Sequence, residues 1–156
     1  MAVTIRPAAP AEAELLTALI LRSKAYWGYD AGFMRRAASE LVLTAGELRR
    51  MDTLVAQDAR EALVGVAAVD HEAVPPLLEL LFVAPEAIGA GIGSRLLQAA
   101  LARAAARGLR ELTVISDPNA EPFYLARGAV RVGEHAVAST GRSLPVLRIA
   151  VPGPSR

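Results

Sequence analysis

The sequence predicts an α+β fold in which one mixed, mostly antiparallel sheet of six to seven strands carries helices on both of its faces. Three consecutive strand patterns, at 53–58, 63–70 and 77–84, are joined by short connections, which favours antiparallel pairing. The strand–helix–strand unit that follows the third pattern requires one parallel pair. The hydrophobic fraction of 53% is sufficient for a packed interior between such layers.

The N-terminal third predicts a strand followed by helices. Residues 3–6 have the pattern of a short strand. Residues 10–27 have one apolar face, with acidic residues in the first turn and basic residues in the last, as the helix dipole favours. A second helix is expected at 30–43 with Asp30 as its N-cap, and a short third helix at 45–51.

The C-terminal half alternates between strands and helices. An amphipathic pattern around Leu96 and Leu97 predicts a helix that ends at Gly108. Asn119 is expected to be the N-cap of a short helix, with Pro122 at its third position, where a missing N–H costs nothing. Further strands are expected at 111–116, 130–137 and 144–151.

The length of 156 residues corresponds to one domain with one core. Neither an internal repeat nor a linker is apparent. We therefore interpret residues 1–152 as a single domain and residues 153–156, which are rich in proline and small residues, as a flexible tail.

The charge and cysteine counts exclude several classes of function. With 17 basic and 16 acidic residues the net charge is +1, so neither nucleic acid nor an anionic membrane is an expected partner. The absence of cysteine excludes disulfides, thiolate metal sites and a cysteine nucleophile, and we expect no metal centre. The chain shows no secretory signal and no apolar stretch of bilayer length, which predicts a cytoplasmic protein. A single lysine beside many arginines and alanines is typical of a GC-rich bacterial genome.

A glycine-rich segment is the central feature of the sequence. The apolar strand pattern ending at Val83-Ala84-Pro85 continues into Ile88-Gly89-Ala90-Gly91-Ile92-Gly93-Ser94 and then into the amphipathic helix. Glycine leaves backbone N–H groups unshielded, and a helix N-terminus carries partial positive charge. The segment therefore predicts a site for a pyrophosphate, although a tight strand-to-helix turn without a ligand is the alternative.

Two familiar phosphate-binding loops do not fit this segment. The dinucleotide pattern of three glycines requires glycine at the positions of Ser94 or Leu96, depending on its register. The P-loop requires a Gly-Lys-Ser/Thr triplet, which the chain lacks.

In its motifs the chain resembles the GCN5-related N-acetyltransferases, the GNAT family. The family loop Gln/Arg-x-x-Gly-x-Gly/Ala, after a strand ending in Val-x-Pro, aligns with residues 83–93. A second family element, an asparagine followed by Phe-Tyr and a glycine, aligns with Asn119, Phe123-Tyr124 and Gly128. The predicted element order also matches, so the resemblance covers nearly the whole chain. Ile88 departs from the family, because it stands where Gln or Arg is usual.

The resemblance implies a set of cofactor-binding residues. The loop residues 88–94, namely Ile88, Gly89, Ala90, Gly91, Ile92, Gly93 and Ser94, would hold the pyrophosphate of acetyl-CoA or another acyl-CoA. The backbone of Phe82 and Val83 would pair with the pantetheine arm in a gap of the sheet, and a backbone N–H there would stabilise the oxyanion. Asn119 and Tyr124 complete this set. For Phe82 and Val83 a plain core role remains the alternative.

Two residues are candidates for proton transfer. Tyr124 is the candidate general acid, since its ordinary pKa of about 10 lies near that of a thiol, about 8.5. Glu79 is the only charge between Pro75 and Pro85, so apolar surroundings would raise its pKa and suit it as general base. The strand-end residues Asp70, His71 and Glu72 are rival bases. A packing tyrosine and a solvent-facing glutamate are the alternatives for Tyr124 and Glu79.

The acceptor pocket is expected between the first two helices. Tyr26, Trp27, Tyr29 and Asp30 form an aromatic cluster with one carboxylate, which suits a cationic amine. A helix corner packed by aromatic rings is the alternative. Arg142 lies between the last two strands, where it either contacts an acidic substrate group or is simply solvated.

The function predicted from these residues is acetyl transfer from acetyl-CoA to a primary amine of a small molecule, directly and without an acyl-enzyme. A peptide or protein N-acetyltransferase, a non-catalytic acyl-CoA-binding module and an unrelated phosphate-binding domain are the alternatives. The free edges of a mixed sheet also allow a homodimer.

Overall fold

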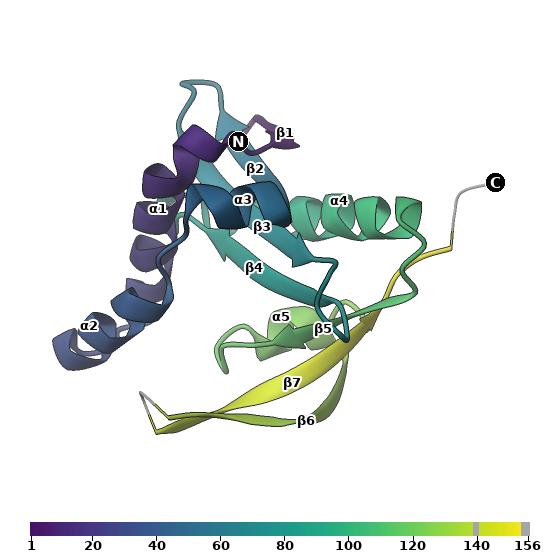
Figure 1. The fold of residues 1–156 in the computed structure, drawn as a ribbon. Coiled ribbons are helices and arrows are strands. Elements are labelled where there is room, and N and C mark those ends of the chain that lie inside the picture. Colours follow the sequence, from purple (N-terminus) through teal and green to yellow (C-terminus); the bar gives the residue numbers. More distant parts are fainter. Residues whose placement is uncertain (139–140, 154–156) are drawn as a thin grey trace.

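One seven-stranded sheet organises the computed structural model, which describes residues 1–138 and 141–153 (Figure 1). Its spatial order is β1-β2-β3-β4-β5-β7-β6. All neighbouring strands are antiparallel except β4 and β5, which are parallel. This arrangement confirms the predicted fold class and the single parallel pair. The strands are β1 Val3–Pro7, β2 Asp52–Asp58, β3 Leu63–Asp70, β4 Leu77–Val83, β5 Glu111–Ile115, β6 Val130–Val137 and β7 Arg142–Ala150.

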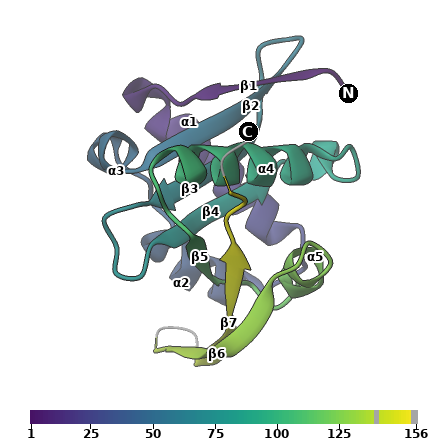
Figure 2. The same cartoon turned by 90° about the vertical axis from the view of Figure 1, so that its right-hand side faces the viewer.

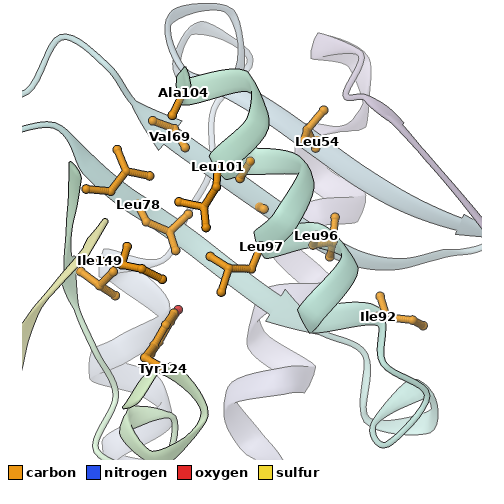
Figure 3. Close-up of a cluster of buried hydrophobic side chains, with 14 of the residues drawn as sticks. Leu54, Val69, Leu78, Ile92, Leu96, Leu97, Leu101, Ala104, Tyr124 and Ile149 are labelled. Carbon is orange, nitrogen blue, oxygen red and sulfur yellow. The ribbon is translucent and has the colours of Figure 1, made fainter. Parts of the chain in front are cut away.

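Helices cover both faces of the sheet, as expected. The helices are α1 Ala13–Ala25, α2 Ala31–Glu40, α3 Ala45–Arg50, α4 Ile92–Ala106 and α5 Glu121–Leu125, with 3-10 turns η1 Pro10–Glu12 and η2 Pro85–Ala87. Figure 2 shows α4 in front of the sheet, with α1 and α3 behind it. Leu16, Leu19 and Ile20 of α1 are fully buried against one face. Leu96, Leu97 and other α4 residues fill the core on the other face (Figure 3). In residues 1–138 and 141–153 no helix is long and apolar enough to cross a membrane.

The parallel pair β4–β5 holds together only at its beginning. Leu77 and Thr113 are paired, and the Thr113 amide donates to the Pro76 carbonyl at 2.9 Å. Beyond this point the two strands diverge, while β5 remains paired along its length with β7 on its other side. One edge of β4 therefore faces a gap instead of a neighbouring strand. Such an edge presents backbone N–H and C=O groups without ladder partners.

A β-bulge modifies β4 beside this gap. Leu80 lies opposite Ala68 and Leu78 lies opposite Val69, so Glu79 is an additional residue without a partner in β3. A bulge bends its strand and redirects the bulged side chain. The bulge therefore contributes to turning β4 away from β5 and places Glu79 at the gap.

Two predicted helix boundaries were wrong. Helix α5 begins at Glu121 with Ala120 as its N-cap, so Asn119 is not the cap and Pro122 is the second helical residue. The reason is that Asp117 forms the preceding turn, accepting hydrogen bonds from the amides of Asn119 and Ala120. The second helix ends at Glu40 and not near Leu43, although its predicted N-cap, Asp30, is confirmed by a 2.7 Å bond from the Phe33 amide. Most of the predicted tail, residues 154–156, lies outside the described residues.

We expect a side chain at Gly65 to destabilise the fold, because α4 lies close to β3 there. A Cβ at Gly65 would lie 2.7 Å from Leu96 Cδ1 and 3.1 Å from Ile92 Cγ2, and both of those side chains are fully buried. Gly65→Val should therefore lower the free energy of unfolding by about 1–3 kcal/mol through overpacking, as measured by urea denaturation. Gly133→Val is the control, since a Cβ there has open space. Equal denaturation midpoints for both variants would contradict this packing.

Candidate active site

A cavity of about 540 Å³ occupies the gap between β4 and β5. Four parts of the chain line it: β4, the glycine loop with the first turn of α4, the end of α1, and the segment from β5 into α5. Its walls bring together most of the predicted cofactor-binding residues, namely Phe82, Val83, Ile88, Gly89, Gly91, Ile92, Gly93, Ser94, Asn119 and Tyr124. Ala90, the remaining member of that predicted set, does not line the cavity.

The glycine loop ends in an uncapped helix N-terminus. Gly89 and Gly91 have φ values of +87° and +77°, which glycine adopts without strain. Gly91 is the N-cap of α4, and as a glycine it offers no side-chain oxygen to the first turn. Among the described residues, the amides of Ile92, Gly93 and Ser94 have no hydrogen-bond acceptor. Three unsatisfied donors at the positive end of a 15-residue helix form an anion site.

Ile88 does not contribute a polar group to this site. It lines the cavity, and its apolar side chain is 45% exposed. The departure from the family motif therefore leaves the backbone N–H groups as the principal donors of the loop.

Tyr124 also lines the cavity. Its side chain is 5% exposed and extends from α5 into the core cluster (Figure 3), with its ring edge-to-face against Phe123 at 5.3 Å. Within the described part of the chain, its hydroxyl has no hydrogen-bond partner. Burial raises the pKa of Tyr124 well above its ordinary value. The phenol therefore stays protonated at neutral pH and is available as a donor to a group inside the cavity.

Glu79 lies at the mouth of the same cavity. Its side chain remains accessible to solvent, but the packed atoms around it, and then the nearby charge of Asp70, raise the pKa of its carboxyl. A carboxyl with a raised pKa is a stronger base when it is ionised. Glu79 also lines a second cavity of about 420 Å³, which meets the first at Leu78, Glu79 and Ile115.

The rival bases lie away from both cavities. Asp70 is paired with Arg50 at 2.6 Å, and this hydrogen bond lowers the pKa of Asp70. His71 and Glu72 lie in the turn after β3 and line neither cavity. Of the four candidates, Glu79 is the one that the fold brings to the gap.

A polar network that the sequence did not reveal forms one wall of the site. We call it the Asp117 network; its members are Lys24, Tyr29, Asp117, Asn119 and Arg142. Asp117 accepts from the Lys24 ammonium, from the Tyr29 hydroxyl at 2.9 Å and from Asn119 Nδ2 at 2.9 Å. Arg142 donates to the Tyr29 hydroxyl at 3.0 Å, and its guanidinium lies 4.0 Å from the Asp117 carboxylate. The network joins the end of α1, the segment before α2, the β5–α5 turn and the start of β7.

The charges of the network determine its titration. Burial alone would raise the pKa of Asp117, but the hydrogen bonds from Lys24, the Asn119 amide and Tyr29 outweigh it and lower the pKa. Burial, and then the adjacent Asp117 carboxylate, raise the pKa of Tyr29. At neutral pH the network therefore contains one carboxylate, two cations and a neutral phenol.

The four residues predicted for the acceptor pocket separate into three environments. Trp27 lines the main cavity, and Tyr26 packs edge-to-face on it at 5.3 Å while remaining half-exposed. Tyr29 belongs to the Asp117 network and stacks on Phe33. Asp30 caps α2 and lines neither cavity, so its observed contact is structural. The part of the chain that the structure describes contains no group of His, Cys, Asp and Glu that could hold a metal ion.

We expect Asp117→Asn to lower the free energy of unfolding by about 2–4 kcal/mol at pH 7, because it leaves the largely buried Lys24 side chain without its counter-charge. Since the folded-state pKa of Asp117 is lowered, its stabilisation is present above the unfolded pKa of about 3.9 and is lost as the pH falls through the folded value. The difference in free energy of unfolding between wild type and Asp117→Asn should therefore disappear only in acid. Urea denaturation against pH measures this, with the exposed Glu14→Gln as control. If this difference in free energy of unfolding is unchanged in acid, the ion pair between Lys24 and Asp117 is not its cause.

Comparisons with known proteins agree with this geometry. A family model described as an acetyltransferase (GNAT) domain matches residues 33–144. A GCN5-related N-acetyltransferase from Rhodopseudomonas palustris has a TM-score of 0.80 at 24% identity, covering 96% of both chains. The PaiA N-acetyltransferase from Thermoplasma acidophilum, solved in complex with coenzyme A, has a TM-score of 0.78 at 18% identity, covering 96% of this chain and 99% of that one.

A third solved structure is also similar. Apo YjaB from Escherichia coli has a TM-score of 0.71 at 25% identity, covering 99% of this chain and all of that one. No curated protein sequence matches the chain. Because the family model spans most of the chain, the protein belongs to the GNAT family of acetyltransferases, whose acyl donor is an acyl-CoA.

Proposed function

We propose that the protein transfers an acetyl group from acetyl-CoA to a primary amine of a small molecule, in one direct step. The observation that carries this proposal is the set of chemical groups that line one cavity. It has unsatisfied amides at its glycine-loop end, and a protonated tyrosine and a carboxylate farther along its walls. Together these supply an anchor for a diphosphate, a donor and a base.

Acetyl-CoA fits this cavity in one orientation. Its pyrophosphate would accept from the amides of Ile92, Gly93 and Ser94, where the helix dipole favours negative charge. Its pantetheine arm would then lie along the free edge of β4, where the N–H and C=O groups of Val83 face away from β3 and match the amides of the arm, while the register pairs those of Phe82 with Val66 of β3. This orientation directs the thioester towards Tyr124 and Glu79.

The residues at that end support a balanced acyl transfer. Glu79, directly or through water, takes a proton from the ammonium of the acceptor, and the neutral nitrogen attacks the thioester carbon. The C–N bond forms, a β4 amide stabilises the oxyanion, and the C–S bond breaks when the intermediate collapses. The departing thiolate takes up the Tyr124 proton. The nitrogen, positive after the attack, loses its second proton through water to the Tyr124 phenolate, and the proton held by Glu79 goes to solvent. The burial that raises the pKa of Tyr124 would also raise the proton affinity of a thiolate beside it.

Enclosure favours a small acceptor. The Asp117 network joins α1 to the β5–α5 turn and β7, so one approach to the thioester is closed by side chains. The second cavity, of about 420 Å³, leads to Glu79 and has the size of a small-molecule site. A peptide or protein acceptor is the second candidate, and a non-catalytic acyl-CoA-binding module is the third.

The direct test is an acceptor screen with acetyl-CoA in which released CoA is detected by a thiol reagent. We expect at least one small amine to give thiol release with formation of its N-acetyl product. Turnover confined to a peptide panel would favour the second candidate. Acetyl-CoA binding without turnover on either panel would favour the third.

We expect Tyr124→Phe to lower kcat by about 10²-fold or more, because the leaving thiolate loses its proton donor. The affinity for acetyl-CoA should change little, since the variant keeps the ring and loses only the hydroxyl. Steady-state kinetics and calorimetric titration measure the two effects separately. The control is Tyr26→Phe, at a half-exposed tyrosine that does not line the cavity. Unchanged kcat in Tyr124→Phe would exclude the phenol as the acid.

We expect kcat/KM to rise with pH through an apparent pKa above the ordinary carboxyl range of about 4.3, because Glu79 must be ionised to act and its pKa is raised. Glu79→Gln should lose this rising limb and most of the activity. A limb that persists in Glu79→Gln belongs to the amine of the acceptor. Glu72→Gln, in the turn after β3, should leave the profile unchanged. An identical low-pH limb in wild type and Glu79→Gln would assign the base elsewhere.

A further inference from the structure

We propose that Arg127 binds the pyrophosphate of the acyl-CoA and replaces the polar side chain that Ile88 does not provide. The proposal rests on acyl-CoA binding at the glycine loop. Arg127 lies just beyond α5 in the sequence, yet its side chain lines the same cavity as Gly91, Gly93 and Ser94. A guanidinium is suited to this ligand, because its planar fork of N–H groups matches phosphate oxygens.

Three contacts hold the guanidinium beside the first turn of α4. Nη1 donates to the Phe123 carbonyl at 2.9 Å, and Nε donates to Ser94 Oγ at 3.3 Å. The guanidinium also stacks 3.7 Å from the centroid of the Phe123 ring. Ser94 is the third residue of α4, and its own amide is one of the three unsatisfied donors. Arg127 is therefore fixed next to the anion site and not merely close to it in sequence.

The charge of Arg127 is unbalanced in the folded chain. Within residues 1–138 and 141–153 it forms no ion pair, and its Nη2 has no hydrogen-bond acceptor. Arg22, in the last turn of α1, is instead neutralised by Glu86 at 3.1 Å. A guanidinium and a helix N-terminus are both positive, so their proximity costs energy until an anion lies between them. A diphosphate would satisfy both groups at once.

A purely structural role is the competing explanation, because the same contacts attach α5 to α4. The two roles differ in what the ligand must contain. A phosphate contact matters only for ligands that carry the pyrophosphate. A structural clamp also positions Tyr124 and Phe123, so its loss would weaken every ligand of the cavity.

The experiment compares the binding of CoA, dephospho-CoA and pantetheine to wild type and to Arg127→Ala. We expect Arg127→Ala to weaken CoA and dephospho-CoA by the same factor of about ten, as for a lost hydrogen bond to a charged group, and to leave pantetheine unchanged. Arg110→Ala, which removes an exposed arginine beyond the far end of α4, is the matched control and should change none of the three. Adding Ile88→Arg to Arg127→Ala should restore part of the lost affinity.

Each other result overturns the proposal. Weakening of CoA but not of dephospho-CoA would move the contact to the 3′-phosphate, and equal weakening of all three ligands would leave a structural clamp. Unchanged affinity for CoA in Arg127→Ala would remove the contact altogether. If wild type itself binds no CoA, the proposed function fails first. If wild type binds CoA and turns over, but Arg127→Ala has no effect on CoA affinity, only this inference fails.

Discussion

The separation of β4 from β5 is the constraint on which the rest of the structure depends. The two strands pair only at Leu77 and Thr113, although they are neighbours in the middle of the sheet. If β4 and β5 paired along their whole length, their backbone groups would be hydrogen-bonded without any ligand, but the cavity would be closed. The fold instead leaves these groups without a neighbouring strand, as the proposed binding of the pantetheine arm requires. The bulge at Glu79 contributes to this geometry by bending β4 at the point where pairing stops.

Two sets of interactions connect the two halves of the sheet, one on each face. On the α4 side, the hydrophobic cluster of Leu78, Leu97, Val114 and Tyr124 joins the two halves of the sheet through apolar contacts. On the α1 side, the Asp117 network links them through charged hydrogen bonds. The apolar contacts are insensitive to pH, whereas the network requires an ionised Asp117. The glycine loop lines the same cavity, and the amides of Ile92, Gly93 and Ser94 have no acceptor among the described residues.

Local patterns predicted the elements of this fold but not what crosses between them. The strands, the glycine loop and the helix that ends at Gly108 each follow from residues adjacent in sequence, and the structure agrees with all three. The Asp117 network combines residues 24, 29, 117, 119 and 142, which share no period or spacing. Its signal is tertiary, so local patterns predicted Asn119 as a helix cap and did not indicate its contact with Asp117. The bulge at Glu79 was hidden for the same reason, because register depends on both strands. Arg127 had no motif position, and only its tertiary contacts with Phe123, Ser94 and the cavity reveal it.

The central claim, that an acyl-CoA is anchored by the backbone of the glycine loop, is tested most directly by calorimetric titration of acetyl-CoA into wild type, Gly91→Glu and Gly108→Glu. The two glycines lie at opposite ends of α4, have φ values of +77° and +81°, and leave open space for a Cβ. Backbone strain is therefore matched, and only the carboxylate at 91 faces the pyrophosphate. The account predicts a Kd in the micromolar range for wild type and Gly108→Glu, with binding abolished in Gly91→Glu. Equal binding by all three folded proteins would contradict it.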